Sequence, residues 1–189
     1  MSTLLESPEL KTLERVIERL NRASIPYMLT GSMALNFYGH PRATNDFDIV
    51  IEVESRDTER LITIFQDGFY ISREAVQEAL NLERMFNILD EETIFKVDLI
   101  VRKNDPFSRE QFQRRRLKEL GSIKGYVISP EDLILAKLEW SKESRSEMQE
   151  RDIRNLVTLL SDELDYSYLE RWAERLGFLE RLKQYYVSP

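Results

Sequence analysis

The chain of 189 residues, with 42% hydrophobic and 32% charged residues, has the composition of a folded globular protein with one sizeable core. It contains no cysteine and a single histidine, which excludes disulfides, thiolate metal sites and multi-histidine zinc sites. The net charge of −7 disfavours a general nucleic-acid binder, and no apolar run approaches the roughly 18 residues that span a bilayer, so we expect a cytoplasmic protein with no membrane partner.

The first half of the chain alternates between helical and strand patterns. Residues 7–9, Ser-Pro-Glu, predict a helix start, because serine is a common N-cap and proline fits the first helical position. Residues 46–53 alternate apolar with polar side chains, which is typical of a strand. The other predicted elements of this half, in chain order, are a strand over 25–30, a Gly-Ser turn, helices over 33–38 and 56–66, a brief strand at 70–71 and a helix over 72–82.

The second half begins with a predicted hairpin and ends in helices alone. Strands over 85–89 and 93–101 flank Asp90-Glu91-Glu92, which suits a turn between antiparallel strands. The pattern then predicts a helix over 107–117 and a last strand over 123–128. Residues 129–132, Ser-Pro-Glu-Asp, are a second helix start, and only helical patterns follow it. We therefore expect an α/β unit over 1–128 and a C-terminal helical unit over 129–189.

Two groups of side chains in these helical patterns have competing interpretations. Three consecutive arginines, residues 114–116, are interpreted as the solvated face of the predicted helix rather than as a binding patch. Trp140 and Trp172 lie at helical spacing among leucines. We predict that both belong to the core rather than to a base-stacking platform.

Acidic side chains mark two of the predicted strands. Asp46 and Asp48 are two positions apart, so they point to the same face of a strand. Asp98 interrupts the apolar run Val-Asp-Leu-Ile-Val, where a charge is costly unless it is compensated or lies at a rim. If the two strands pair in a suitable register, the three carboxylates supply the hard oxygen ligands that Mg²⁺ needs when it carries a nucleoside triphosphate.

These residues suggest roles in nucleotidyl transfer. Asp98 is the best candidate for the base that deprotonates an attacking hydroxyl. Gly31 and Ser32 form a turn at a helix start, where backbone N–H groups can hold phosphate. Alternatives remain open, because Asp46 and Asp48 also suit the solvent face of an edge strand. Lys96, two residues before Asp98, could likewise neutralise it by a simple salt bridge.

The spacing of these motifs resembles the polymerase-β-like nucleotidyltransferase superfamily. The resemblance is carried by Leu-Thr-Gly-Ser-Met-Ala-Leu at 29–35, by Arg-Ala-Thr-Asn-Asp-Phe-Asp-Ile-Val at 42–50 and by Val-Asp-Leu-Ile at 97–100. The Arg-x-Thr-x-Asp-x-Asp form is similar to the branch of abortive-infection and type IV toxin–antitoxin nucleotidyltransferases, as is the helix that starts at Ser129 and contains Lys137. The resemblance implies an α+β fold, with a mixed sheet flanked by helices and followed by a C-terminal helical unit.

Carried over residue by residue, the resemblance implies a complete site. Gly31 and Ser32 would bind the phosphates of a nucleoside triphosphate, and Asp46, Asp48 and Asp98 would be both the catalytic and the metal-binding residues, with Mg²⁺ or Mn²⁺ as the metal. Two cations are further candidates for binding the triphosphate. Arg42 lies in a loop that could reach it or could be a plain surface residue, and Lys137 could face the cleft or cover apolar surface with its stem.

The leading hypothesis is thus a Mg²⁺-dependent enzyme that transfers a nucleoside monophosphate to an acceptor hydroxyl. The acceptor could be a tRNA 3′ end, a protein side chain or a small molecule such as an aminoglycoside or a lincosamide. A nucleotide-binding regulatory or antitoxin-type module without catalysis is the alternative, and a protein-interaction domain is a third possibility. Whether a protein partner or a second copy of the chain binds is left open by the sequence.

Overall fold

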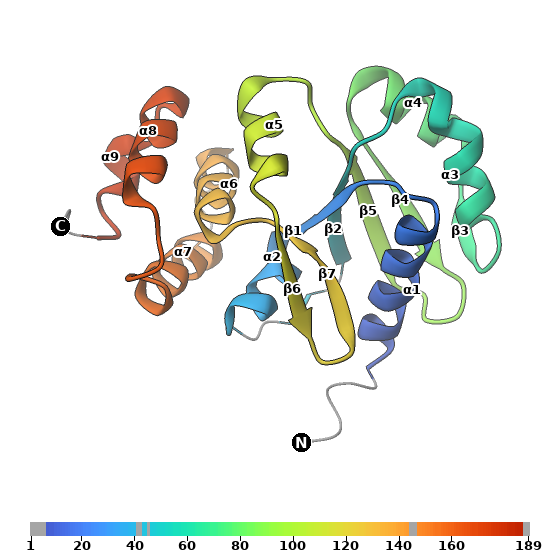
Figure 1. Cartoon of the computed structure of the whole chain (residues 1–189), viewed down its shortest axis with the longest axis horizontal. Helices are drawn as coiled ribbons and strands as arrows, with labels where there is room; N and C mark the ends of the chain where they lie inside the picture. Colours follow the sequence, from blue (N-terminus) through green and yellow to red (C-terminus); the bar gives the residue numbers. More distant parts are fainter. Residues whose placement is uncertain (1–6, 41–42, 45, 144–146, 187–189) are drawn as a thin grey trace.

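A computed structural model describes residues 7–40, 43–44, 46–143 and 147–186 of the chain. In chain order the strands are β1 (Tyr27–Thr30), β2 (Asp46–Ile51), β3 (Phe69–Ile71), β4 (Met85–Asp90), β5 (Lys96–Val101), β6 (Arg116–Leu120) and β7 (Ile123–Val127). They form a seven-stranded mixed sheet in the order β3-β4-β5-β2-β1-β7-β6. The predicted α+β fold with a mixed sheet is confirmed (Figure 1).

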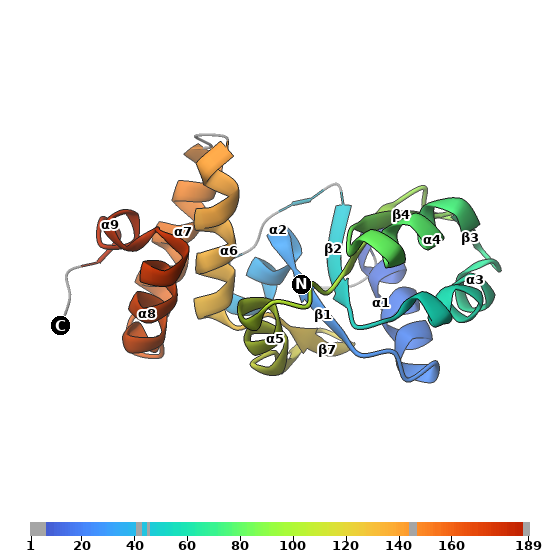
Figure 2. The same cartoon turned by 90° about the horizontal axis from the view of Figure 1, so that it is seen from above.

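The helices surround this sheet on its faces and at one end. Their bounds are α1 (Pro8–Arg22), α2 (Gly31–Ala34), η1 (Leu35–Tyr38, a 3₁₀ helix), η2 (Ser55–Asp57, a 3₁₀ helix), α3 (Thr58–Phe65), α4 (Arg73–Leu82), α5 (Pro106–Gln113), α6 (Pro130–Glu143), α7 (Glu147–Leu159), α8 (Tyr166–Leu176) and α9 (Leu179–Leu182). Figures 1 and 2 both show α1, α3 and α4 at one end of the molecule and α6 to α9 gathered at the other. In the described part of the chain, no helix is long and apolar enough to cross a membrane.

The first helix follows the predicted pattern closely. The Ser7 side chain accepts a hydrogen bond of 3.3 Å from the Leu10 backbone N–H, as an N-cap does. Leu13, Val16 and Leu20 are fully buried, and their helical spacing places them on one stripe of the helix. Burial of this stripe packs α1 onto the core of the molecule.

The strands at the centre of the sheet position the acidic residues. On β2, Phe47 and Ile49 are fully buried, whereas Asp46 and Asp48 are part-exposed on the other face. β2 pairs in parallel with β5 and antiparallel with β1. It therefore lies inside the sheet, and the interpretation of its acids as the solvent face of an edge strand is wrong.

The predicted helix over 107–117 is wrong in its second half. α5 ends at Gln113, and residues 116–120 form β6, which pairs antiparallel with β7 across a turn at Gly121. The interpretation of the arginines at 114–116 as the solvated face of this helix is therefore also wrong, because the helix ends before them. Arg114 and Arg116 each lie 3.2 Å from the buried carboxylate of Glu131. These ion pairs connect the sheet to the first turn of α6.

The C-terminal helices include one tryptophan in the core and one outside it. Trp172 is buried, and its ring centroid lies 4.9 Å from that of Phe107, which confirms its predicted place. Trp140 is 53% exposed, so its predicted place in the core is wrong. The predicted helix start at Ser129 is confirmed, because its hydroxyl accepts a 3.1 Å hydrogen bond from the Asp132 N–H.

Candidate active site

The parallel pairing of β2 with β5 brings the predicted acids onto neighbouring strands. Asp48 is the register partner of Asp98, and Asp46 is the partner of Lys96. Asp98 is only 5% exposed. Its Oδ1 is buried and has no hydrogen-bond partner among the described residues. Because such a carboxylate oxygen normally has a donor or a cation beside it, this atom is suited to a ligand from outside the chain.

Lys96 lies between two of the three acids. Its ammonium donates a hydrogen bond of 2.9 Å to Asp98 Oδ2 and lies 3.6 Å from Asp46 Oδ2. The hydrogen bond to Asp98 raises the pKa of Lys96. Within the described ranges, no three acidic or histidine side chains are grouped as a metal-binding cluster. The three-carboxylate metal site therefore stays a prediction. The alternative salt bridge between Lys96 and Asp98 is present in the structure.

Asp48 lies directly beside the Gly-Ser turn, because it is the register partner of Thr30 on β1. Burial raises its pKa to about 6, with smaller contributions from the charges of Asp46 and Asp98. Gly31 has φ of +64°, and a Cβ at this position would overlap the Asp48 carboxylate. Glycine is required here both by the backbone conformation and by the close approach of the acid. The turn and Asp48 are therefore direct neighbours in the structure, and their joint role in binding stays a prediction.

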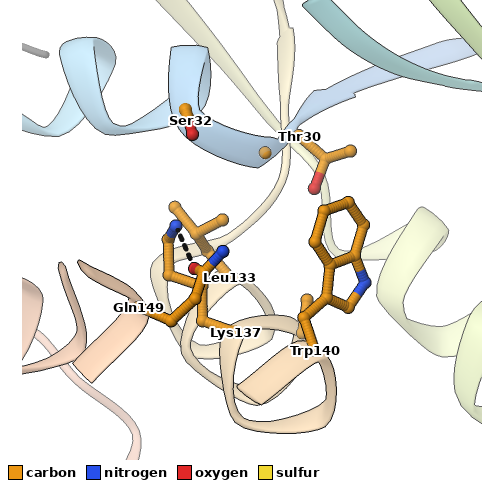
Figure 3. Close-up of a pocket in the computed structure, with 8 residues that line it drawn as sticks. Thr30, Ser32, Leu133, Lys137, Trp140 and Gln149 are labelled. Atoms are coloured by element: carbon orange, nitrogen blue, oxygen red, sulfur yellow. Dashed lines mark hydrogen bonds between the residues drawn. The ribbon is translucent and has the colours of Figure 1, made fainter. Parts of the chain in front are cut away.

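A shallow, partly open pocket lies beside this turn. It lies between the start of α2 and the helices α6 and α7 (Figure 3). Its lining comprises Thr30, Gly31, Ser32, Leu133, Ala136, Lys137, Trp140 and Gln149. The structure therefore brings Lys137 into one pocket with the two residues predicted to bind phosphate.

The ammonium of Lys137 is buried and held by residues of α7. It donates hydrogen bonds of 2.9 Å to Asp152 Oδ2 and 3.0 Å to Gln149 Oε1, and the latter is the dashed line in Figure 3. Lys137 is 4% exposed. The cation faces the pocket side of α6 rather than covering outer apolar surface. Its predicted contact with a triphosphate remains a prediction.

Sequence reasoning missed several residues of this region, and one predicted residue cannot be placed. Arg42, a candidate for triphosphate binding, lies outside the described residues. Gln149 and Trp140 line the pocket although neither was expected there. The lone histidine, His40, is not a plain surface residue, because its Nε2 lies 3.1 Å from Asn155 Nδ2 and 3.9 Å from Asp152 Oδ1. The polar residues Asp152 and Asn155 of α7 are the only signal in the sequence that could have indicated these contacts with His40.

The donor set at β2 and β5 fits a divalent cation chemically. Carboxylate oxygens are the ligands that Mg²⁺ and Mn²⁺ prefer. The buried Oδ1 of Asp98 lacks a hydrogen-bond donor among the residues described. The pKa of Asp48 is raised mainly by burial and further by the negative charges of Asp46 and Asp98, both of which disfavour its ionised form. A cation bound here would give Asp98 Oδ1 a partner and would lower the pKa of Asp48. It would also displace the Lys96 ammonium.

Comparisons with known proteins agree with this arrangement at the level of the fold. Neither models of known protein families nor the sequences of curated proteins give a match. Among solved structures, ANT(2″)-Ia in complex with adenylyl-2″-tobramycin is similar with a TM-score of 0.63 and 13% identity, over 93% of this chain and 99% of that one. The lincomycin-bound lincosamide antibiotic adenylyltransferase LnuA is similar with a TM-score of 0.53 and 17% identity, over 79% of this chain and 96% of that one.

A third similar structure matches almost the whole chain. It is an antigenic nucleotidyltransferase-like protein from Paracoccidioides brasiliensis, with a TM-score of 0.54 and 20% identity, over 97% of this chain and 95% of that one. At these identities the comparisons show the fold alone. The chain has the nucleotidyltransferase fold that the motifs at 29–35, 42–50 and 97–100 predict. The likeness to the toxin–antitoxin branch stays a prediction.

Proposed function

We propose that the chain is a nucleotidyltransferase that moves a nucleoside monophosphate from a nucleoside triphosphate to an acceptor hydroxyl. The observation that carries the proposal is the pairing of Asp48 with Asp98 in register across β2 and β5, with Gly31 packed directly against the Asp48 carboxylate. This reaction requires phosphate-binding groups and neighbouring carboxylates in one place.

The acids have distinct roles in the proposed reaction. Asp98 accepts the proton of the acceptor hydroxyl, and before the reaction its Oδ2 accepts the Lys96 hydrogen bond. The acceptor oxygen bonds to the α-phosphorus, the bond from that phosphorus to the bridging oxygen breaks, and pyrophosphate leaves. Asp46, Asp48 and Asp98 would hold Mg²⁺ or Mn²⁺. A bound metal ion would neutralise negative charge on the triphosphate.

The triphosphate would lie along the Gly-Ser turn toward α6. Backbone N–H groups at Gly31 and Ser32 are available partners for phosphate oxygens. Lys137 shares the pocket with both residues, and its ammonium, which is paired with Asp152, would be the cation nearest to the phosphates. This placement leaves the α-phosphorus on the Asp48 side of the turn, near the proposed base.

For the acceptor we propose a small hydroxylated molecule as the first candidate. Two proteins of similar fold are solved with adenylyl-2″-tobramycin and with lincomycin, which supports testing aminoglycosides and lincosamides. The net charge of −7 makes an RNA end a weaker candidate, since a polyanion is attracted by basic surfaces.

The function is tested by following the α-phosphate. The chain is incubated with each α-labelled nucleoside triphosphate and Mg²⁺, together with separated small-molecule, RNA and protein fractions. We expect label in one fraction, and loss of that label by at least about 100-fold with Asp98→Asn, as for removal of a catalytic base. Absence of labelled product in all fractions, or equal labelling by the variant, contradicts the proposal.

A further inference from the structure

Trp140 is a large aromatic side chain left exposed beside the candidate nucleotide pocket. It is 53% exposed and lines the pocket together with Thr30 and Lys137. Figure 3 shows its indole ring on one side of the pocket, below Thr30, with the Lys137–Gln149 hydrogen bond on the other side. The other tryptophan of the chain, Trp172, is buried in the helical core. The exposure of Trp140 is thus a local feature of this pocket.

The position of Trp140 on α6 relates it to the proposed phosphate site. It follows Lys137 by three residues, so the two side chains are neighbours on one helix face. Residues Leu133 and Ala136 of the same helix also line the pocket. The pocket therefore has a polar part at Ser32 and at Lys137, whose ammonium is paired with Asp152, and an aromatic part at Trp140. A ligand with polar groups at one end and a flat ring at the other matches these two parts.

A nucleoside triphosphate has this chemistry within one molecule. We propose that Trp140 is the platform on which the base of the nucleoside triphosphate stacks, an inference that rests on the proposed function and assigns the base-binding part of the same site. Stacking of a base on an aromatic side chain contributes to affinity for every base, because each base has a π-face. The platform supplies binding energy with little discrimination among the four nucleotides.

The inference is tested by binding rather than by turnover. Affinities of the full chain for ATP, for CTP and for inorganic tripolyphosphate are measured by calorimetry with Mg²⁺ present. We expect Trp140→Ala to weaken both nucleotides by at least about fivefold, in line with the cost of losing one stacking side chain, and to leave tripolyphosphate binding unchanged. Trp140→Phe, which keeps a ring, should stay within about threefold of the wild type.

Leu159→Ala is the matched control. Leu159 is also 53% exposed and lies on the neighbouring helix α7, so its truncation removes a comparable apolar surface outside the pocket lining. It should change none of the three affinities. The stacking role of Trp140 is contradicted if Trp140→Ala leaves nucleotide affinity unchanged, or if it weakens nucleotide and tripolyphosphate binding equally. Neither result contradicts the proposed function. If the wild-type chain binds no nucleotide, both proposals fail.

Discussion

Lys96 donates a hydrogen bond of 2.9 Å to Asp98, two residues further along β5, and its ammonium also lies 3.6 Å from Asp46. A cation of the chain itself therefore occupies the space between two predicted metal ligands. Its charge stabilises the neighbouring acids. A metal ion at this proposed site would compete with the ammonium for the same oxygens, so its affinity would depend on Lys96.

The first prediction concerns that competition. Lys96→Met should bind Mn²⁺ about fivefold more tightly than the wild type or better, because a nearby positive charge is removed in a partly solvated site. Isothermal calorimetry without nucleotide measures the affinity. Lys124→Met is the control, since Lys124 pairs with Glu119 on the β6–β7 hairpin and should leave the affinity unchanged. Equal or weaker Mn²⁺ binding by Lys96→Met would show that the ammonium does not compete.

The second prediction separates a catalytic acid from a structural one. Asp90, on the neighbouring strand β4, is fully buried, and its carboxylate accepts 2.8 Å hydrogen bonds from Thr12 and Arg15. Asp90→Asn should lower the free energy of unfolding by about 1–3 kcal/mol, the range for a lost charged hydrogen bond, and leave the rate per folded molecule near the wild type. Asp98→Asn should leave the free energy of unfolding near that of the wild type and lower the rate per folded molecule. Urea denaturation and initial rates on the same samples give both quantities, and a shared phenotype of the two variants contradicts the assignment.

The third prediction follows from the raised pKa of Asp48. The pKa is about 6 in the folded chain against an ordinary value of 3.8, so the folded state holds this proton to higher pH than the unfolded state does. The contribution of Asp48 to stability is therefore greatest below pH 3.8 and is lost as the pH rises toward 6. The loss amounts to about 1–3 kcal/mol at most.

Asp48→Asn removes this dependence. In the presence of a chelator, the variant should gain stability relative to the wild type as the pH is raised from 4.5 to 7, roughly in proportion to the ionisation of Asp48. Urea denaturation at several pH values measures the difference. A difference between variant and wild type that is independent of pH would contradict the raised pKa. Added Mg²⁺ should reduce the pH effect, because a bound cation favours the ionised carboxylate.

The fourth prediction tests the contact of the Gly-Ser turn with the acids. Gly31 and Gly39 both have positive φ, +64° and +78°, but only at Gly31 would a Cβ meet other atoms of the chain, those of Asp48. Gly39→Ala should cost about 1–2 kcal/mol of stability for the left-handed backbone and keep full activity. Gly31→Ala should cost more stability and reduce activity at least about tenfold, because a misplaced catalytic group has effects of this size. Similar activity of the two variants would indicate that the turn does not position Asp48.

Much of the site could be predicted because strand periodicity is local. The two-residue spacing of Asp46 and Asp48, and the apolar residues around Asp98, determine which face each acid occupies once the strands form. The pairing of Asp48 with Asp98 could not be predicted, because β2 and β5 are connected through a 3₁₀ helix, two α-helices and two further strands. Nothing in the sequence gives the register of strands so far apart, and only the family resemblance suggested it.

The errors have equally specific causes. Residues 114–116 are arginines, which favour helices, so the strand β6 was missed, although Gly121 and Ser122 between apolar residues are a signal for a tight hairpin turn. Trp140 was misplaced because α6 is buried on most sides, with Leu133, Ile134, Leu135 and Leu138 almost inaccessible. Helical spacing does not distinguish the one open face of such a helix.

The most direct test of the account uses two labels on the same nucleotide. The chain is incubated with Mg²⁺, an acceptor and ATP labelled at either the α- or the γ-phosphorus. The account predicts that the α-label appears on the acceptor, that the γ-label appears in pyrophosphate, and that Asp98→Asn abolishes both while Asp90→Asn retains them. Transfer of the γ-label to the acceptor, or undiminished α-transfer by Asp98→Asn, would contradict nucleotidyl transfer at this site.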